Sequence, residues 1–154
     1  MQMQRYETLI LVSPDITNDE ANELEKAFDR KVQEYKGNII SYDRWGKYHL
    51  AYQVKHNDYG VYFLVRFEVP ATKKEIAVKD VKSLLDLKFN TLVLRYMTSQ
   101  LSNTASLEYK RPLSLDEKPR DMSLFSKEHR HHHDSMPRVE AMGSETAVSE
   151  KIAE

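Results

Sequence analysis

The sequence predicts an α+β fold, in which a four-stranded antiparallel sheet carries two helices on one of its faces. Two segments repeat apolar residues every three or four positions, as amphipathic helices do, and four segments alternate as strands do. A polar turn joins the two middle strand segments, which gives the order β-α-β-β-α-β. We expect this domain at residues 1–100 and a flexible, disordered C-terminal tail at residues 101–154, where no periodicity is sustained.

The first strand is expected at residues 5–12 and the first helix directly after it. Thr17 and Glu20 have the spacing of a capping box, in which each side chain satisfies the other residue's backbone N–H. The helix should end near Gly37, because glycine adopts the left-handed cap conformation at little cost. Its apolar stripe consists of Ala21, Leu24, Phe28, Val32 and Tyr35.

A long hairpin follows. Residues 38–55 are expected to form a strand that bends near Gly46, since a glycine inside a strand often marks a bulge. Residues 56–60 form the turn, and residues 61–69 form the third strand. The odd-numbered residues of this third strand alternate without interruption and are expected in the core.

The second half has the same order of elements as the first, a helix followed by a strand. Thr72 and Glu75 repeat the capping-box spacing ahead of a second helix, and residues 91–98 are expected to form the last strand. In that strand we expect Leu92, Leu94 and Tyr96 on one side and Val93, Arg95 and Met97 on the other. Two right-handed crossovers in this order produce the ferredoxin-like sandwich, which leaves one sheet face uncovered.

The uncovered face is the candidate functional surface. We expect it to carry Arg5, Leu9, Leu11, Tyr62, Leu64, Arg66, Arg95 and Met97. Arg5 and Arg95 are expected to lie near each other on adjacent strands, where two guanidinium groups beside apolar side chains suit a phosphate contact together with a protein interface. The alternative is that these arginines pair with Glu7 and Glu68 on the same face.

The run from Trp45 to Tyr52 combines aromatic and basic residues, including Lys47, Tyr48 and His49. Base stacking with cationic support is one use for such a run. Packing within the hairpin is the favoured reading for its apolar members. An RNA-recognition motif is disfavoured, because the third strand lacks two of the aromatic residues that such a motif requires.

Composition and motifs exclude several classes of protein. No cysteine is present, the N-terminus lacks the pattern of a signal peptide, and no apolar run suits a membrane helix, so we expect a cytoplasmic protein. The net charge of −1 means that any polyanion must bind a local patch. No phosphate loop, nucleophile elbow or paired carboxylates are present. We therefore expect that the protein is not an enzyme and that it holds no cofactor.

A histidine-rich stretch in the tail has the residue types of a zinc or nickel site. Its candidate ligands are Glu128, His129, His131, His132, His133 and Asp134. No second ligand cluster accompanies them, so incidental metal capture is favoured over a functional metal site.

Four motifs closely resemble the S-six protein family of the bacterial small ribosomal subunit, in order and spacing, over about residues 4–100. They are Arg5-Tyr6-Glu7, Trp45-Gly46-Lys47 running into Leu50-Ala51-Tyr52, Gly60-Val61-Tyr62, and Val93-Leu94-Arg95. The resemblance implies the ferredoxin-like fold and a structural, ribosome-bound role in assembly and translation. It also implies binding to the central domain of the small-subunit ribosomal RNA beside the S-eighteen protein, with no DNA or membrane partner.

The resemblance and the face assignments together give two sets of candidate residues. The RNA or partner interface would comprise Arg5, Lys47, Tyr48, Tyr62, Arg66 and Arg95. Motif residues expected to pack are Tyr6, Trp45, Gly46, Leu50, Ala51 and Tyr52. The family motif commonly has a second basic residue where this chain has Tyr48, which would stack instead. A small-molecule-binding regulatory module on the same fold is the alternative function, and a metal-handling protein is a third.

Overall fold

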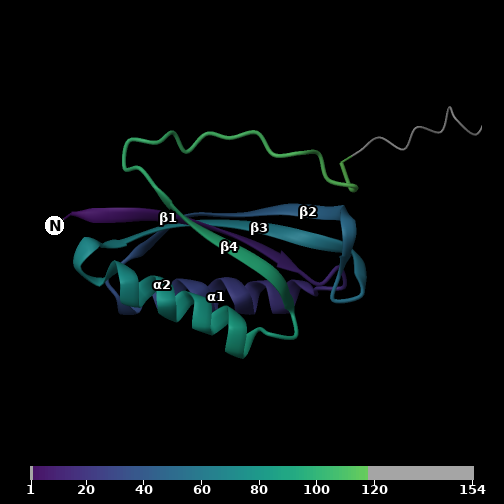
Figure 1. Cartoon of the computed structure of the whole chain (residues 1–154), viewed down its shortest axis with the longest axis horizontal. Helices are drawn as coiled ribbons and strands as arrows, with labels where there is room; N and C mark the ends of the chain where they lie inside the picture. The colour runs from purple at the N-terminus through teal and green to yellow at the C-terminus, as the bar shows by residue number, and fades with distance from the viewer. Residues whose placement is uncertain (1, 118–154) are drawn as a thin grey trace, which may run out of the picture. The chain divides into compact units, whose positions relative to one another are not determined.

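The computed structural model describes residues 2–117 and confirms the ferredoxin-like architecture. The four strands are β1 (Met3–Val12), β2 (Asn38–Val54), β3 (Asn57–Pro70) and β4 (Val93–Leu101). The two helices are α1 (Asn18–Glu34) and α2 (Lys74–Ser83), the second flanked by single turns at Ala71–Lys73 and Leu84–Lys88. The sheet order is β2-β3-β1-β4, with antiparallel pairing throughout. Both helices cover the same face of the sheet (Figure 1).

The main core lies between the helices and the sheet. The odd-numbered residues of β3 from Val61 to Val69 are buried there as expected, together with the apolar stripe of α1. Tyr6 also packs on this side, with its ring stacked 5.7 Å from that of Phe67. Burial of this continuous apolar layer supplies the main driving force for folding.

The two expected capping boxes have different outcomes. Thr17 caps α1 as expected, because its hydroxyl accepts from the Glu20 N–H while the Glu20 carboxylate accepts from the Thr17 N–H. The expected box at Thr72 is wrong, since α2 has no side-chain cap. A 3₁₀ turn at Ala71–Lys73 leads directly into α2, so Thr72 lies inside this turn rather than at the start of the helix.

The face expected for two residues of β4 is also wrong. Leu94 packs with Leu11, Leu50 and Val54 on the face away from the helices, whereas Val93 lies in the main core. The register between β1 and β4 shifts at Leu11 and Val12, where a bulge inserts one residue. Because side chains alternate with a period of two, one extra residue exchanges the faces on either side of it.

The C-terminal boundary of the folded part differs from the expected position. Residues 102–117, called the strap below, run across the sheet face opposite the helices (Figure 1) and contact β2 and β3 through several hydrogen bonds. The expected flexible tail began at residue 101. Leu101 is instead the last residue of β4. The strap therefore covers part of the sheet face that was expected to be uncovered.

Candidate nucleic-acid and protein interface

The candidate arginines lie on the expected face of the sheet but not together. Arg5 pairs with Leu101, whereas Arg95 pairs with Leu11. The offset along β1 is 11 − 5 = 6 residues, which corresponds to about 20 Å. The expectation that Arg5 and Arg95 adjoin each other is therefore wrong, because antiparallel pairing puts the start of β1 beside the end of β4. The two arginines lie at opposite ends of the sheet.

Arg5 is tied to its surroundings at its end of the sheet. Its guanidinium lies 3.6 Å from the Glu68 carboxylate and donates to the Asn103 carbonyl at 3.0 Å. Asn103 in turn donates to the Met3 carbonyl at 2.8 Å. The expected alternative of a pairing with Glu68 thus holds for Arg5, and its side chain fastens the start of the strap.

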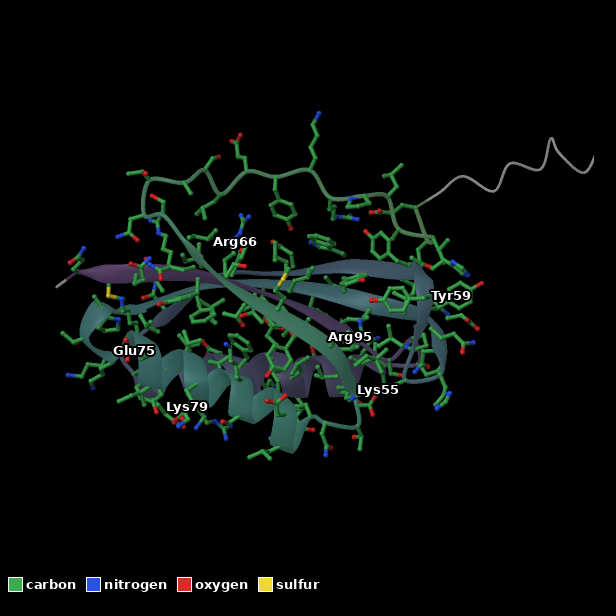
Figure 2. The ribbon with its side chains drawn as sticks, in the orientation of Figure 1. Lys55, Tyr59, Arg66, Glu75, Lys79 and Arg95 are labelled. Atoms are coloured by element: carbon green, nitrogen blue, oxygen red, sulfur yellow. The ribbon has the colours of Figure 1, made fainter. Side chains whose placement is uncertain are left out.

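Arg66 lies between the sheet and the strap (Figure 2). Only 7% of the residue is exposed, and its Nε donates to the Glu7 carboxylate at 3.2 Å. It also donates to the Leu107 carbonyl, and its guanidinium carbon lies 4.7 Å from the centre of the Tyr109 ring. A guanidinium that is buried and paired in this way has no free edge for a phosphate group while the strap is in place.

The aromatic residues of the hairpin bind the middle of the strap. Trp45 donates its indole N–H to the Tyr109 hydroxyl at 3.0 Å, and their ring centres are 5.8 Å apart. Trp45 and Tyr48 also pack against Tyr62, with ring centres 6.1 and 5.6 Å away. The Tyr48 hydroxyl donates to the Pro112 carbonyl. The expected interface residues Tyr48 and Tyr62 thus form the floor under the strap.

The end of the strap approaches β2 closely at Gly46. The Leu115 N–H donates to the Lys47 carbonyl at 2.9 Å, as a strand residue would. Ser114 is only 2% exposed, and a Cβ at Gly46 would lie 2.8 Å from its Cβ. Gly46 has φ +106 and sits at a register shift, so the expected bend is confirmed and glycine is required there.

A charged pair locks this end of the strap. Arg111 donates to the Glu117 carboxylate at 2.7 Å and to the Trp45 carbonyl at 3.1 Å. The Glu117 carboxylate also accepts from the N–H and hydroxyl of Ser114. The Arg111 guanidinium and these bonds lower the pKa of Glu117 to about 2. The strap end is therefore most firmly held with Glu117 ionised.

Beyond Lys47, at the same end of the sheet, the tip of the β2–β3 hairpin curls over the face opposite the helices. β2 and β3 are paired at His49 and again at Val54, but not between them. Leu50 and Val54 reach across β3 to Leu11 of β1 and Leu94 of β4. Leu50 is thus packed as expected, and this part of the hairpin forms a small second core.

Tyr52 does not pack as expected. It is 64% exposed, and its hydroxyl accepts from the Arg95 guanidinium at 2.8 Å, with the cation 5.4 Å from the ring centre. Ala51 is also exposed. Because the hairpin tip bulges between its paired residues, this segment turns its side chains toward solvent and toward β4. Tyr52 therefore orients Arg95 rather than filling a core.

Lys55 lies beside Arg95 (Figure 2), a neighbour that the motif analysis did not single out. Its ammonium group donates to the Val93 carbonyl at 3.1 Å and to the Asn90 carbonyl at 3.4 Å. Lys47 lies on the outer side of the hairpin, with its ammonium 5.3 Å from the centre of the Tyr59 ring. Lys55 and Arg95 line one pocket and form the hairpin-end cluster. Lys47 is separate from this cluster, because it pairs with Val61, whose side chain lies in the core on the helix side of the sheet.

A cavity of about 340 Å³ opens beside this cluster. Its walls are mainly apolar, from Leu9, Leu11 and Leu50, with Arg95 at its rim. The cavity volume falls within the range of small-molecule sites. Among residues 2–117 no group of three or more potential ligands could hold a metal ion, and the histidine-rich stretch lies outside the described residues. No helix of the described part is long and apolar enough to cross a membrane.

Comparison with known proteins identifies relatives of the whole sheet and both helices. Residues 5–100 match the family model described as "Ribosomal protein S6". The small ribosomal subunit protein bS6 of Moorella thermoacetica is 29% identical over 105 residues, which are 68% of this chain and all of that protein. The bS6 protein of Dictyoglomus turgidum is 30% identical over 99 residues, 64% of this chain and 96% of that protein.

A solved structure shares the fold. The 30S ribosomal protein S6 of Thermotoga maritima superimposes with a TM-score of 0.56 at 19% identity, covering 65% of this chain and 89% of that one. The whole strap, residues 102–117, lies beyond the residues matched by the family model.

Proposed function

We infer that this chain, which belongs to the ribosomal protein S6 family, binds the central domain of the small-subunit ribosomal RNA together with the S-eighteen protein. Its role is structural and non-enzymatic, in assembly of the small ribosomal subunit and in translation. A ribosome-bound, cytoplasmic location follows from that role. The observation that carries the proposal is the family match across every strand and both helices.

The hairpin-end cluster is the proposed RNA contact. Arg95 is exposed, is oriented by Tyr52, and lies next to Lys55. Two cations held side by side in this way suit adjacent phosphate groups. Arg5 would provide a separate contact about 20 Å away. The net charge of −1 gives no general attraction to RNA, so these local cations must supply the affinity.

Binding of a fragment of the central ribosomal RNA domain tests this assignment. The variant Arg95→Ala should weaken binding and reduce the slope of log K against log salt by about one unit, because one phosphate contact is lost. Lys79→Ala is the matched control, since it removes the same charge from the exposed side of α2 in the helix layer (Figure 2). Equal losses in the two variants would mean that only net charge matters.

The S-eighteen protein is proposed to strengthen RNA binding. Titrating the RNA fragment with this chain, alone and with the S-eighteen protein, should give tighter binding in the presence of the partner. Unchanged RNA affinity would remove the S-eighteen protein from the proposal while leaving the RNA contact to be judged by Arg95→Ala.

The cavity beside Arg95 favours one second candidate, a small-molecule-binding regulatory module. That function would produce a ligand-dependent rise in the melting temperature and no co-sedimentation with small ribosomal subunits. The family match favours the ribosomal role.

A further inference from the structure

The strap is an extended segment held mainly by polar and aromatic contacts. Its carbonyl groups accept from Arg66 and Tyr48, and the Tyr109 ring contacts both Trp45 and the Arg66 guanidinium. One backbone N–H, that of Leu115, adds a strand-like bond to β2. Contacts of this kind recognise an extended peptide carrying one aromatic side chain.

The strap does not fill the space beneath it. A cavity of about 190 Å³ remains between Tyr109 and three sheet residues, Leu9, Leu64 and Met97. Met97 is 64% exposed, and the strap's own leucines, Leu113 and Leu115, also remain exposed. A segment that buries little apolar surface is held weakly and opens at low cost in free energy.

We propose that the floor formed by Trp45, Tyr48, Tyr62 and Arg66 is a peptide-binding surface, and that the strap occupies it until an extended, aromatic-bearing segment of a protein partner displaces it. The inference rests on the proposed function in one respect, since the S-eighteen protein is taken as the partner. RNA is the less suitable occupant, because the buried Arg66 is already paired with Glu7 and the surface offers carbonyl-directed donors rather than free cations.

The chain contains a built-in reporter of the strap. Trp45 is the only tryptophan, and the Tyr109 ring and hydroxyl cover it. Opening of the strap should expose the indole to water and shift its fluorescence emission to longer wavelength. The variants Tyr109→Ala and Tyr109→Ala/Arg111→Ala should show this shift, and Lys110→Ala should not, because Lys110 is an exposed neighbour on the same segment. Unshifted emission in both release variants would overturn the proposal.

Titration with the S-eighteen protein tests the competition. Since a closed strap reduces the apparent affinity by the closed fraction, the release variants should bind the S-eighteen protein about tenfold more tightly than the natural chain. Lys110→Ala should bind like the natural chain. Equal or weaker binding by the release variants would overturn the proposal, because the strap would then be neutral or part of the partner's site.

A synthetic peptide of residues 102–117 tests the surface without any partner. Added to the full-length Tyr109→Ala/Arg111→Ala chain, it should bind and return the Trp45 emission toward shorter wavelength. The same peptide carrying Tyr109→Ala should bind at least about tenfold more weakly, because it loses the contacts with Trp45 and Arg66. Failure of the unmodified peptide to bind would overturn the peptide-binding surface.

These arms separate the inference from the proposed function. If the S-eighteen protein binds no variant, the proposed partner is wrong, and the peptide result alone decides the surface. If the ribosomal RNA fragment shifts the Trp45 emission of the natural chain and competes with the peptide, the occupant is RNA and the assignment to a protein segment is overturned.

Discussion

Gly46 is the residue at which sheet and strap come closest. Its φ of +106 suits only glycine, and a Cβ would lie 2.8 Å from the Ser114 Cβ. We therefore expect Gly46→Ala to lower the free energy of unfolding by about 1–2 kcal/mol through backbone strain and to shift the Trp45 emission to longer wavelength. Urea denaturation and fluorescence measure the two effects.

The double variant Gly46→Ala/Ser114→Gly separates them. Removing the Ser114 side chain relieves the contact with the strap but not the backbone strain. The emission should return toward that of the natural chain while the loss of stability remains. A Gly46→Ala variant as stable as the natural chain would contradict the strained geometry.

Glu117 makes closure of the strap dependent on pH. Its ordinary pKa of 4.5 falls to about 2 beside Arg111, so the closed state binds fewer protons than the open state does between these pH values. Its stabilising contribution is complete above pH 4.5 and is lost as the pH falls toward 2. The Trp45 emission should shift within this window while far-UV circular dichroism reports that the sheet persists. In Glu117→Gln the shift within this window should be absent; an identical shift would assign it to another group.

Residue-scale sequence reasoning succeeded where the period of a strand decided the answer. The face of Arg66 followed from the alternation of β3, and that of Tyr6 from β1. The face of Leu94 did not, because a bulge has no signal in the alternation itself. The separation of Arg5 from Arg95 required the register of two strands that are distant in sequence.

At the scale of elements, the start of each helix gives a matched comparison. Thr17→Ala should lower the free energy of unfolding by about 1 kcal/mol, because the N-cap hydrogen bond to α1 is lost. Thr72→Ala, at the same sequence spacing ahead of α2, should change it by less than about 0.5 kcal/mol, since Thr72 caps nothing there. Equal losses in urea denaturation would contradict the assignment of these two helix starts.

The strap shows why one element escaped prediction. Its backbone forms neither a helix nor a ladder longer than one bond, so its sequence has no period of two or of 3.6. Its contacts come from single side chains such as Tyr109 and Arg111, whose partners lie about 65 residues earlier. Tyr109 and the nearby Arg111 were the available signal that this segment makes contacts. Composition alone could not distinguish such a segment from a flexible tail.

At the scale of the whole molecule, the sheet presents two separable surfaces on its face opposite the helices. The hairpin-end cluster is proposed to contact RNA, and the floor under the strap is proposed to contact a protein segment. The fold was predictable because each element has a strong local pattern and one topology joins them. The division of the face was not, because it depends on the curl of the hairpin tip and on the path of the strap.

Arg95→Ala follows from this division. It should weaken association with small ribosomal subunits and change the free energy of unfolding by no more than about 1 kcal/mol, since Arg95 is exposed and loses only its contact with Tyr52. Denaturation of Arg95→Ala beside Lys79→Ala measures the stability. Unfolding of the domain by Arg95→Ala would show that its side chain belongs to the core.

Co-sedimentation with small ribosomal subunits tests the central claim most directly. The chain, produced in bacterial cells and followed through a sucrose gradient, should migrate with the small subunits in stoichiometric amounts. Lys79→Ala should do the same, and Arg95→Ala should be depleted from that fraction. A chain that remains entirely at the top of the gradient, while its melting temperature rises with a small ligand, would contradict a ribosomal role.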